Sequence, residues 1–446
     1  MTIEGYDKRS FGIKLSEVVS PSRPILSVEH LVGREQELDR IEKALLAPGR
    51  NVFIFGERGV GKTSLAATAA NQWQSSDADY IDVSCAPDST VNSIISSIAS
   101  QAVSNSWTSE IKRTQETKIN FKWLSYSLKN EYSPVDISGR IKHLSDAIEV
   151  LREVSALHSE SPVVVLDEVD RIKSEKEIEL LADLLKQLGD KRVDLKFIFT
   201  GVGSSLNEIL GSHRSAIRQL ETVELPRLSW DARWEIALHA LDKFNITLDR
   251  DIYIRLAAVS DGYPYYVHLI IEKLLWVLFE KEEIVHSVTW DDYFKALDNA
   301  ILSISAEMAR PYELAINQRS QDYEEVLWST SADEWQGAYL STMHARYTSI
   351  MSQIEDKEAL SYDKFASRIR NLLKPTCGEI LKKGQRVGFY HYREKMLRGY
   401  IRMQAEANRV EIISEEAKST IKNYIQVPAK NVGYFKSSIP KGVKQS

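Results

Sequence analysis

The sequence predicts an α/β fold with a parallel five-stranded sheet and helices on both faces, followed by a helical region and a winged-helix domain. Short, continuous apolar runs alternate with helical patterns over residues 31–225, which is typical of parallel strands covered on both faces. Residues 229–304 show helical spacing alone. Between 321 and 413, three helical patterns precede two strand-like runs that flank a Lys-Lys-Gly-Gln-Arg turn. Three helices and a hairpin are the elements of a winged helix.

The predicted strands are runs of Val, Ile and Phe at 51–55, 80–84, 163–166, 196–200 and 222–225. About 80 residues separate the second strand from the third, more than one crossover helix requires. Helical spacing at 88–102 and 137–157 predicts two helices in this interval. An alternating stretch between the two helices predicts a hairpin-like insertion at 107–134.

The remaining chain extends this plan at both ends. Residues 1–30 are polar, with Pro21 and Pro24 near their end, and this composition predicts an arm or linker. After the α/β core at 31–228, helices are expected at 231–244, 249–259, 265–279 and 290–304. A basic tail at 414–446 follows the winged-helix domain.

Composition excludes several classes of protein. The chain has 446 residues, of which 43% are hydrophobic, enough for two or three domains with sizeable cores. The two cysteines, Cys85 and Cys377, exclude a disulfide framework and favour a reducing, cytoplasmic setting. We expect no secretion signal and no membrane span, because the longest apolar run, 274–279, is far shorter than the roughly 20 residues that cross a bilayer.

The net charge of −6 hides an uneven distribution. Residues 361–446 contain 18 Lys plus Arg and 7 Asp plus Glu, a net charge of +11, which leaves −17 for residues 1–360. This asymmetry suggests that a polyanion binds the C-terminal part. A basic surface that docks on the chain's own acidic body, or on another copy, explains the same pattern.

A glycine-rich loop between the first strand and an Ala-rich helix is the strongest functional signal. It reads Gly56-Glu-Arg-Gly-Val-Gly-Lys-Thr63 and fits the P-loop pattern G-x-x-x-x-G-K-[ST]. Its backbone N–H groups and the helix N-terminus favour a bound phosphate. We expect Lys62 to reach the β- and γ-phosphates of ATP and the Thr63 hydroxyl to bind Mg²⁺. The candidate ATP contacts are Gly56, Glu57, Arg58, Gly59, Val60, Gly61, Lys62, Thr63 and Ser64.

An acidic pair ends the third predicted strand. Asp167 and Glu168 follow the apolar run Val163-Val-Val-Leu166. In an alternating α/β pattern downstream of a P-loop, this pair predicts a metal ligand and a catalytic base. We expect Asp167 to lie near the Mg²⁺ and Glu168 to polarise a water for attack on the γ-phosphate.

Two further polar positions lie near the ends of later strands. Thr200 ends the fourth strand. Its hydroxyl either senses the γ-phosphate or holds the attacking water, or it caps the next turn. Arg214 precedes the fifth strand and is a candidate to reach a neighbouring subunit's phosphate site, since guanidinium stabilises phosphoryl charge. Arg218 is the alternative for that role, and both residues are otherwise solvated surface arginines.

These motifs together resemble those of AAA+ ATPases. The segment Leu31-Val-Gly-Arg-Glu35, the P-loop, the acidic pair, the strand ending at Thr200 and the motif Gly262-Tyr-Pro264 follow the order seen in that family. The chain is most similar to the Orc1/Cdc6-like branch and the neighbouring STAND-type ATPases. The resemblance covers residues 31–304 and extends more weakly to a C-terminal winged helix.

The resemblance implies a P-loop AAA+ core, a helical lid over the nucleotide at 229–304, and a site between subunits of a homo-oligomer. It also implies nucleotide contacts by Val32, Gly33 and Pro264. The lid helix departs from the AAA+ pattern because it lacks the arginine that touches the γ-phosphate. This lid is closer to the STAND type and favours a slow switch. His268 is its one ionisable candidate as a phosphate sensor, although its apolar helix face favours a core histidine with satisfied hydrogen bonds.

The basic C-terminal module is the second functional signal. The helix at 361–374 buries one apolar face and carries Arg368, Arg370 and Lys374 elsewhere. In a winged helix, the corresponding helix enters the major groove of DNA and the wing contacts phosphates. The candidate wing contacts are Lys382, Lys383 and Arg386. Winged helices also bind proteins, so a protein partner is the alternative.

Two functional hypotheses follow. In the first, the chain is an ATP-dependent switch that hydrolyses ATP at an intersubunit site, oligomerises and engages DNA through residues 321–413, in replication, transposition or antiviral defence. In the second, it is a STAND-type signalling scaffold whose nucleotide state gates assembly with a separate effector protein. The expected cofactors are ATP and Mg²⁺ in both.

Overall fold

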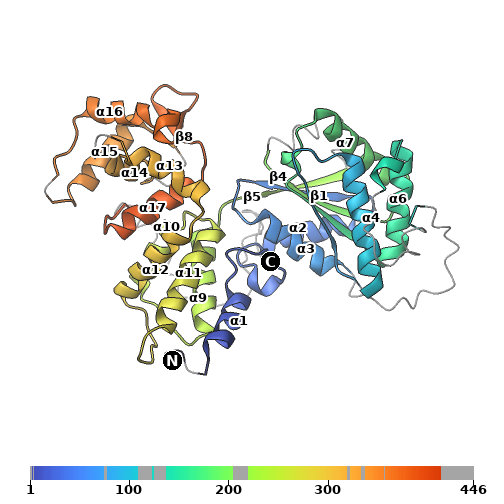
Figure 1. The fold of residues 1–446 in the computed structure, drawn as a ribbon, viewed down its shortest axis with the longest axis horizontal. Helices are drawn as coiled ribbons and strands as arrows, with labels where there is room; N and C mark the ends of the chain where they lie inside the picture. Colours follow the sequence, from blue (N-terminus) through green and yellow to red (C-terminus); the bar gives the residue numbers. More distant parts are fainter. Residues whose placement is uncertain are drawn as a thin grey trace, which may run out of the picture.

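The computed structural model describes residues 3, 5–74, 78–108, 123–124, 137–203, 219–318, 322–332, 337–355 and 357–412. Within these ranges the chain forms an α/β unit, a helical unit and a C-terminal unit (Figure 1). Most of the predicted insertion at 107–134 lies outside the described residues, although its first two residues end helix α4. Arg214, Arg218 and the tail at 414–446 also lie outside them.

Five parallel strands form the sheet of the α/β unit, in the order β2-β3-β4-β1-β5. This confirms the predicted fold class. The strands are β1 (Asn51–Gly56), β2 (Ile81–Ser84), β3 (Val163–Asp167), β4 (Lys196–Gly201) and β5 (Leu220–Leu225). Because the carboxyl ends of parallel strands meet at one edge, the P-loop after β1 and the acidic pair at the end of β3 lie at the same edge of the sheet.

Helices cover both faces of this sheet. Helices α2 (Glu35–Leu46) and α3 (Lys62–Trp73) pack on the face that includes Val52 and Ile54. Helices α4 (Val91–Thr108), α6 (Leu144–His158) and α7 (Glu175–Asp190) form a second core with Phe53 on the other face (Figure 1). Successive strand residues point to opposite faces. Both faces bury apolar side chains, so residues 52–55 of β1 are all apolar.

Four helices follow β5, close to the predicted bounds. They are α9 (Trp230–Asp242), α10 (Arg250–Val259), α11 (Pro264–Phe279) and α12 (Trp290–Ser303). Ser229 caps α9 by accepting the N–H of Ala232. Pro264 occupies the first turn of α11, where its missing N–H costs no helical hydrogen bond. These local signals explain why the sequence located the helices well.

The prediction of an arm or linker at 1–30 is wrong for its central part. Residues Lys8–Val18 form helix α1, which begins with a capping box between Asp7 and Ser10. Phe11 is fully buried and stacks on Phe279 of α11, with ring centroids 4.2 Å apart. The partner ring is more than 250 residues away in sequence, so local composition alone did not reveal this contact.

The C-terminal unit combines helices with a small antiparallel sheet. Its helices are α13 (Ala306–Ile316), α14 (Tyr323–Thr330), α15 (Leu340–Met351), α16 (Tyr362–Asn371) and α17 (Leu397–Ala407). Strands β7 (Leu381–Lys383) and β8 (Phe389–Tyr392) form the predicted hairpin, and β6 (Gly337–Tyr339) adds a third strand beside β8. Helix α17 packs on α10 and α12 and joins this unit to the helical unit (Figure 1). None of the described helices combines the length and apolarity needed to cross a membrane.

Candidate nucleotide-binding site

The P-loop runs from the end of β1 to the start of α3. Gly59 and Gly61 have φ values of 81° and 96°, a left-handed conformation that favours glycine. The Lys62 ammonium donates to the carbonyl oxygens of Gly56 and Glu57 at 3.2 and 2.9 Å. Burial lowers the pKa of Lys62, while Asp170 and other nearby carboxylates oppose this shift. The loop therefore holds a lysine among backbone groups suited to a phosphate.

Asp167 lies at the centre of a hydrogen-bonded group at the edge of the sheet. Thr63 Oγ1 donates to Asp167 Oδ2 at 2.8 Å. The Thr200 hydroxyl donates to the other carboxylate oxygen and accepts the Glu168 N–H at 3.1 Å. One hydroxyl and one carboxylate side by side fit Mg²⁺, which prefers oxygen ligands and completes its octahedron with phosphate oxygens and water.

Thr200 and Glu168 differ in how they can meet a nucleotide. Thr200 is fully buried and its hydroxyl is engaged by Asp167, so in this structure it positions the carboxylate. A direct contact of Thr200 with the nucleotide stays a prediction. Glu168 is half-exposed, lines the cavity above the P-loop and pairs with Arg171 at 3.0 Å. Its left-handed backbone, with φ of 56°, marks a sharp turn directly after β3.

A cavity of about 520 Å³ lies above the P-loop. Among the residues proposed from sequence, its walls include Val32, Arg58, Gly59, Val60, Gly61, Lys62, Thr63, Ser64, Asp167, Glu168 and Pro264. The proposed contacts Gly33, Gly56, Glu57 and Thr200 are outside this lining. The predicted site residues from four separate segments thus converge on one space.

The N-terminal segment forms a wall of this cavity that the motifs did not indicate. Residues 20–25 line it beside the P-loop helix. The Ile25 N–H donates to Ser64 Oγ at 3.2 Å, and Thr68 Oγ1 donates to the Ile25 carbonyl at 2.8 Å. The Ser64 hydroxyl is therefore engaged by the chain itself. Pro21 and Pro24 were the one sequence signal of an extended strap here.

The segment before α2 connects the P-loop to the helical unit. Gly33 has a φ of 71°, and a Cβ at this position would lie 2.4 Å from the Cβ of Ala232 on α9. Arg34 is buried and donates to the carbonyls of Val60 and Pro226 at 3.2 and 2.7 Å. Any side chain at residue 33 would therefore displace α9, and Arg34 fixes the loop against the end of β5.

Residues 30–198 match the family described as AAA ATPase domain. The chain carries an AAA ATPase domain. The match includes the P-loop, the acidic pair and strands β1 to β3, so this part of the chain is a P-loop ATPase. No curated protein matches this sequence.

Several solved structures are similar to this chain at low sequence identity. A Walker-type ATPase of Pyrococcus abyssi is 16% identical, with a TM-score of 0.50 over 85% of this chain and 99% of that one. The ORC2 protein of Aeropyrum pernix in ADPNP and ADP complexes is 13% identical, with a TM-score of 0.46 over 90% and 99%. The ORC1 protein of Aeropyrum pernix in complex with DNA is 16% identical, with a TM-score of 0.43 over 89% and 97%.

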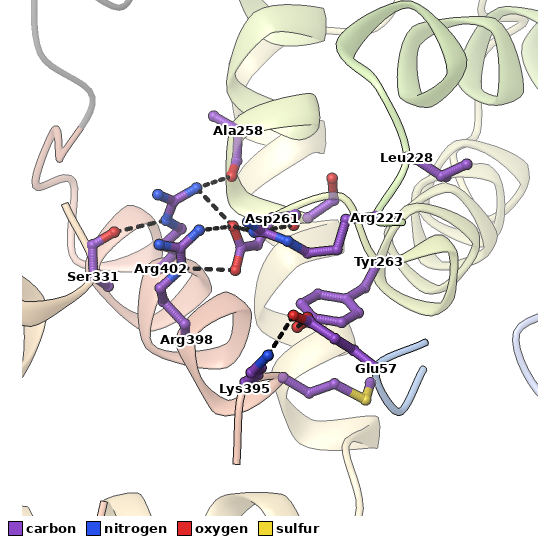
Figure 2. Close-up of polar contacts among 12 residues, drawn as sticks. Glu57, Arg227, Leu228, Ala258, Asp261, Tyr263, Ser331, Lys395, Arg398 and Arg402 are labelled. Carbon is purple, nitrogen blue, oxygen red and sulfur yellow. Dashed lines mark hydrogen bonds and ion pairs between the residues drawn. The ribbon is translucent and has the colours of Figure 1, made fainter. Parts of the chain in front are cut away.

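The C-terminal unit contacts the P-loop of the AAA ATPase domain directly. Glu57 accepts a hydrogen bond from Lys395 at 2.6 Å and another from the Tyr263 hydroxyl at 2.9 Å (Figure 2). Met396 closes over the backbone of Gly59, since a Cβ on that glycine would lie 2.3 Å from the Met396 sulfur. One P-loop carboxylate thus joins the loop, the helical unit and the start of α17.

A buried aspartate anchors the same helix to the turn before α11. Asp261 is 2% exposed and accepts hydrogen bonds from Arg398 of α17 and from Arg227, the latter at 2.8 Å (Figure 2). Arg402 lies 3.3 Å from the same carboxylate and donates to the carbonyl of Ser331 at 2.8 Å. Burial alone would raise the pKa of Asp261, but Arg402 and Arg398 outweigh it and lower the pKa. The sequence did not indicate this cluster, because its charged residues come from three segments that are far apart in the chain.

The residues predicted to contact DNA differ in exposure and in pairing. Arg368 is not free, because its guanidinium donates to both oxygens of Asp322, at 2.8 and 3.0 Å, and lies over Tyr323. A contact between Arg368 and DNA bases stays a prediction. The other candidates are exposed: Arg370, Lys374, Lys382, Lys383 and Arg386.

Proposed function

We propose that this chain is an ATP-dependent switch whose nucleotide state sets the position of the C-terminal unit. The supporting observation is that the start of α17 contacts both the P-loop and the turn before α11, through Lys395, Met396 and Arg398. A change of the P-loop or of the lid on nucleotide binding or hydrolysis must alter these contacts. In this proposal residues 229–304 are the lid and 321–413 form a winged helix.

The proposed chemistry is in-line hydrolysis at slow rate. Lys62 binds the β- and γ-phosphates, while Thr63 and Asp167 hold Mg²⁺, which neutralises phosphate charge when bound. Glu168 orients a water and accepts its proton. The lid helix α11 contains no arginine, so it supplies no guanidinium to the γ-phosphate. Arg214 of a neighbouring copy is proposed to supply it in a homo-oligomer.

Glu168→Gln tests the proposed base. The variant is expected to bind ATP with unchanged affinity and to lose at least about 100-fold in the rate of hydrolysis, because a general base contributes roughly 10² to 10⁴. Phosphate release and ATP binding are measured on the same sample. Glu179→Gln, an exposed residue of α7, is the control and should hydrolyse ATP like the wild type. Unchanged turnover in Glu168→Gln would exclude Glu168 as the base.

The C-terminal unit is proposed to engage DNA through its hairpin. Lys382, Lys383 and Arg386 are exposed on one short hairpin, with Val387 fully exposed at its tip. Three cations close together suit a row of phosphates. Arg370 and Lys374 add positive charge at the end of α16.

A salt titration of DNA binding by the full-length protein tests this proposal. The affinity of the wild type for DNA should fall steeply as the salt concentration rises. In a plot of log affinity against log salt concentration, each contact between a cation and a phosphate adds roughly 0.9 to the steepness of the slope. Replacing Lys382, Lys383 and Arg386 by Gln should therefore reduce the slope by about 3. The control is the same loss of charge on α7 and the residues that flank it, at Lys173, Lys176 and Lys191, which are also exposed. Equal slopes for both triple variants would contradict DNA contact by the hairpin.

A signalling scaffold is the second candidate. It is favoured by the engagement of Arg368 with Asp322, which removes one proposed base-reading side chain. In that case the C-terminal unit contacts a separate effector protein, and the full-length chain does not bind DNA even at low salt.

A further inference from the structure

His268 on α11 is a buried polar side chain in the wall of the nucleotide cavity. It is 3% exposed, and neither Nδ1 nor Nε2 has a hydrogen-bond partner in the part of the chain that the structure describes. The expected burial is confirmed, but the expected satisfied hydrogen bonds are not. Buried polar groups are nearly always paired, because an unmade hydrogen bond is costly. This imidazole therefore has capacity for a ligand.

His268 lies at the end of the cavity that is farther from the P-loop. Pro264 begins α11 beside the P-loop, with its Cγ 3.7 Å from where a Cβ on Gly61 would lie. His268 follows one helical turn later on the same side of the helix. A second cavity, of about 310 Å³, has no P-loop residue in its lining. It shares four residues with the first cavity: His30, Val32, Ile236 and His268.

The walls at this end suit a planar base. Val32, Leu228 and Ile236 are apolar and come from three different segments. A nucleotide whose phosphates occupy the P-loop extends its ribose and base away from it. Apolar side chains cover the faces of such a ring, and a few polar groups fix its edge. His268 is a polar group at the right end of the cavity for that edge.

The protonation state of His268 favours a base over a phosphate. Burial lowers the pKa of His268 to about 4, and His30 contributes in the same direction. The ring is therefore neutral at neutral pH, with one N–H donor and one acceptor nitrogen. A neutral ring does not supply the positive charge that strengthens a contact with phosphate. A neutral imidazole can instead accept from an exocyclic amino group, such as the 6-amino group of adenine.

We propose that His268 recognises the base of the bound nucleotide by accepting a hydrogen bond from the 6-amino group of adenine. The inference rests on the proposed binding of ATP at the P-loop and adds the residue that selects the base. His268 is then a specificity-determining residue, distinct from those that hold the phosphates and the metal.

Binding of two nucleotides by the full-length protein tests the inference. ATP is compared with purine riboside triphosphate, which lacks only the 6-amino group. The wild type should bind ATP roughly 10-fold more tightly, the value of one buried hydrogen bond. His268→Phe fills the site without nitrogen atoms, so ATP should bind about as weakly as the analogue. His268→Asn and His268→Gln place an amide near Nδ1 and Nε2 respectively, and the one that matches the contacting nitrogen should retain the preference.

His158→Phe is the matched control, because His158 is equally buried, on α6, outside both cavity linings. It should keep the wild-type preference. Equal binding of both nucleotides by the wild type, or an unchanged preference in His268→Phe, would overturn the role of His268 while ATP binding at the P-loop stands. If the wild type binds neither nucleotide, or if Lys62→Ala binds ATP normally, the proposed function fails and the inference fails with it.

Discussion

Lys62→Ala is expected to weaken ATP binding by at least about 100-fold, equivalent to roughly 2.7 kcal/mol. The substitution removes a cation that lies within the P-loop and donates to two of its carbonyl oxygens. Charged hydrogen bonds to phosphate are among the strongest that proteins make, and alanine offers nothing in their place. Titration calorimetry with ATP and Mg²⁺ measures the change directly.

Lys196→Ala is the matched control for this variant. The Lys196 ammonium also donates to two carbonyl oxygens, those of Ala47 and Arg50 at 2.7 and 3.3 Å. Burial lowers the pKa of Lys196, as it does for Lys62. However, Lys196 begins β4, at the sheet edge opposite the P-loop. Its loss should leave ATP affinity unchanged, and an equal loss in both variants would mean that Lys62 acts only through the stability of the fold.

Asp261→Asn is expected to release α17 from the turn before α11 and to lower the free energy of unfolding by about 3–5 kcal/mol. The substitution keeps the size of the side chain but leaves Arg398 and Arg402 without the carboxylate that they share. Burial of unpaired guanidinium groups makes such a change costly. Urea unfolding and hydrogen exchange of the α17 amides measure the two effects.

The pH of that experiment follows from the lowered pKa of Asp261. A carboxyl group whose pKa is lower in the folded state stabilises the protein at pH values above its ordinary pKa of 3.8. This stabilisation is lost as the pH falls through the pKa of the folded state. Measurements at neutral pH therefore capture the full contribution.

Asp292→Asn is the control for Asp261→Asn. It distinguishes the general effect of losing a buried carboxylate from the specific release of α17. Asp292 is equally buried and pairs with Lys281 at 2.6 Å, inside the helical unit. Both variants should lose stability, but α17 amides should exchange faster in Asp261→Asn alone. Unchanged exchange of α17 in both would show that Asp261 does not hold the C-terminal unit in place.

Local signals in the sequence were sufficient for the sheet and for the P-loop. Continuous apolar runs identify strands that are covered on both faces, and the glycines of the P-loop have the backbone that the motif requires. Asp167 could be predicted because it ends such a strand. The contact between Thr63 and Asp167 then follows from parallel topology, which brings the ends of β1 and β3 to one edge.

Long-range contacts between single residues could not be predicted in this way. Helix α1 has few apolar residues, and its burial depends on Phe279 in another unit. Lys395 and Glu57 lie 338 positions apart, and no local pattern marks either as a partner. Arg368 carried the right charge for DNA, but Asp322 engages it through the fold. Charge alone does not show which cations are free.

The central claim is that nucleotide state moves the C-terminal unit relative to the AAA ATPase domain. Energy transfer between two dyes measures this movement directly. The dyes are attached to Lys191→Cys in the ATPase domain and to Val387→Cys in the hairpin. Both positions are exposed, whereas the native Cys85 and Cys377 are buried. In the Glu168→Gln background, transfer efficiency with ATP and Mg²⁺ should differ from that with ADP, and added Lys62→Ala should abolish the difference. Equal efficiency with ATP, with ADP and without nucleotide would contradict the switch.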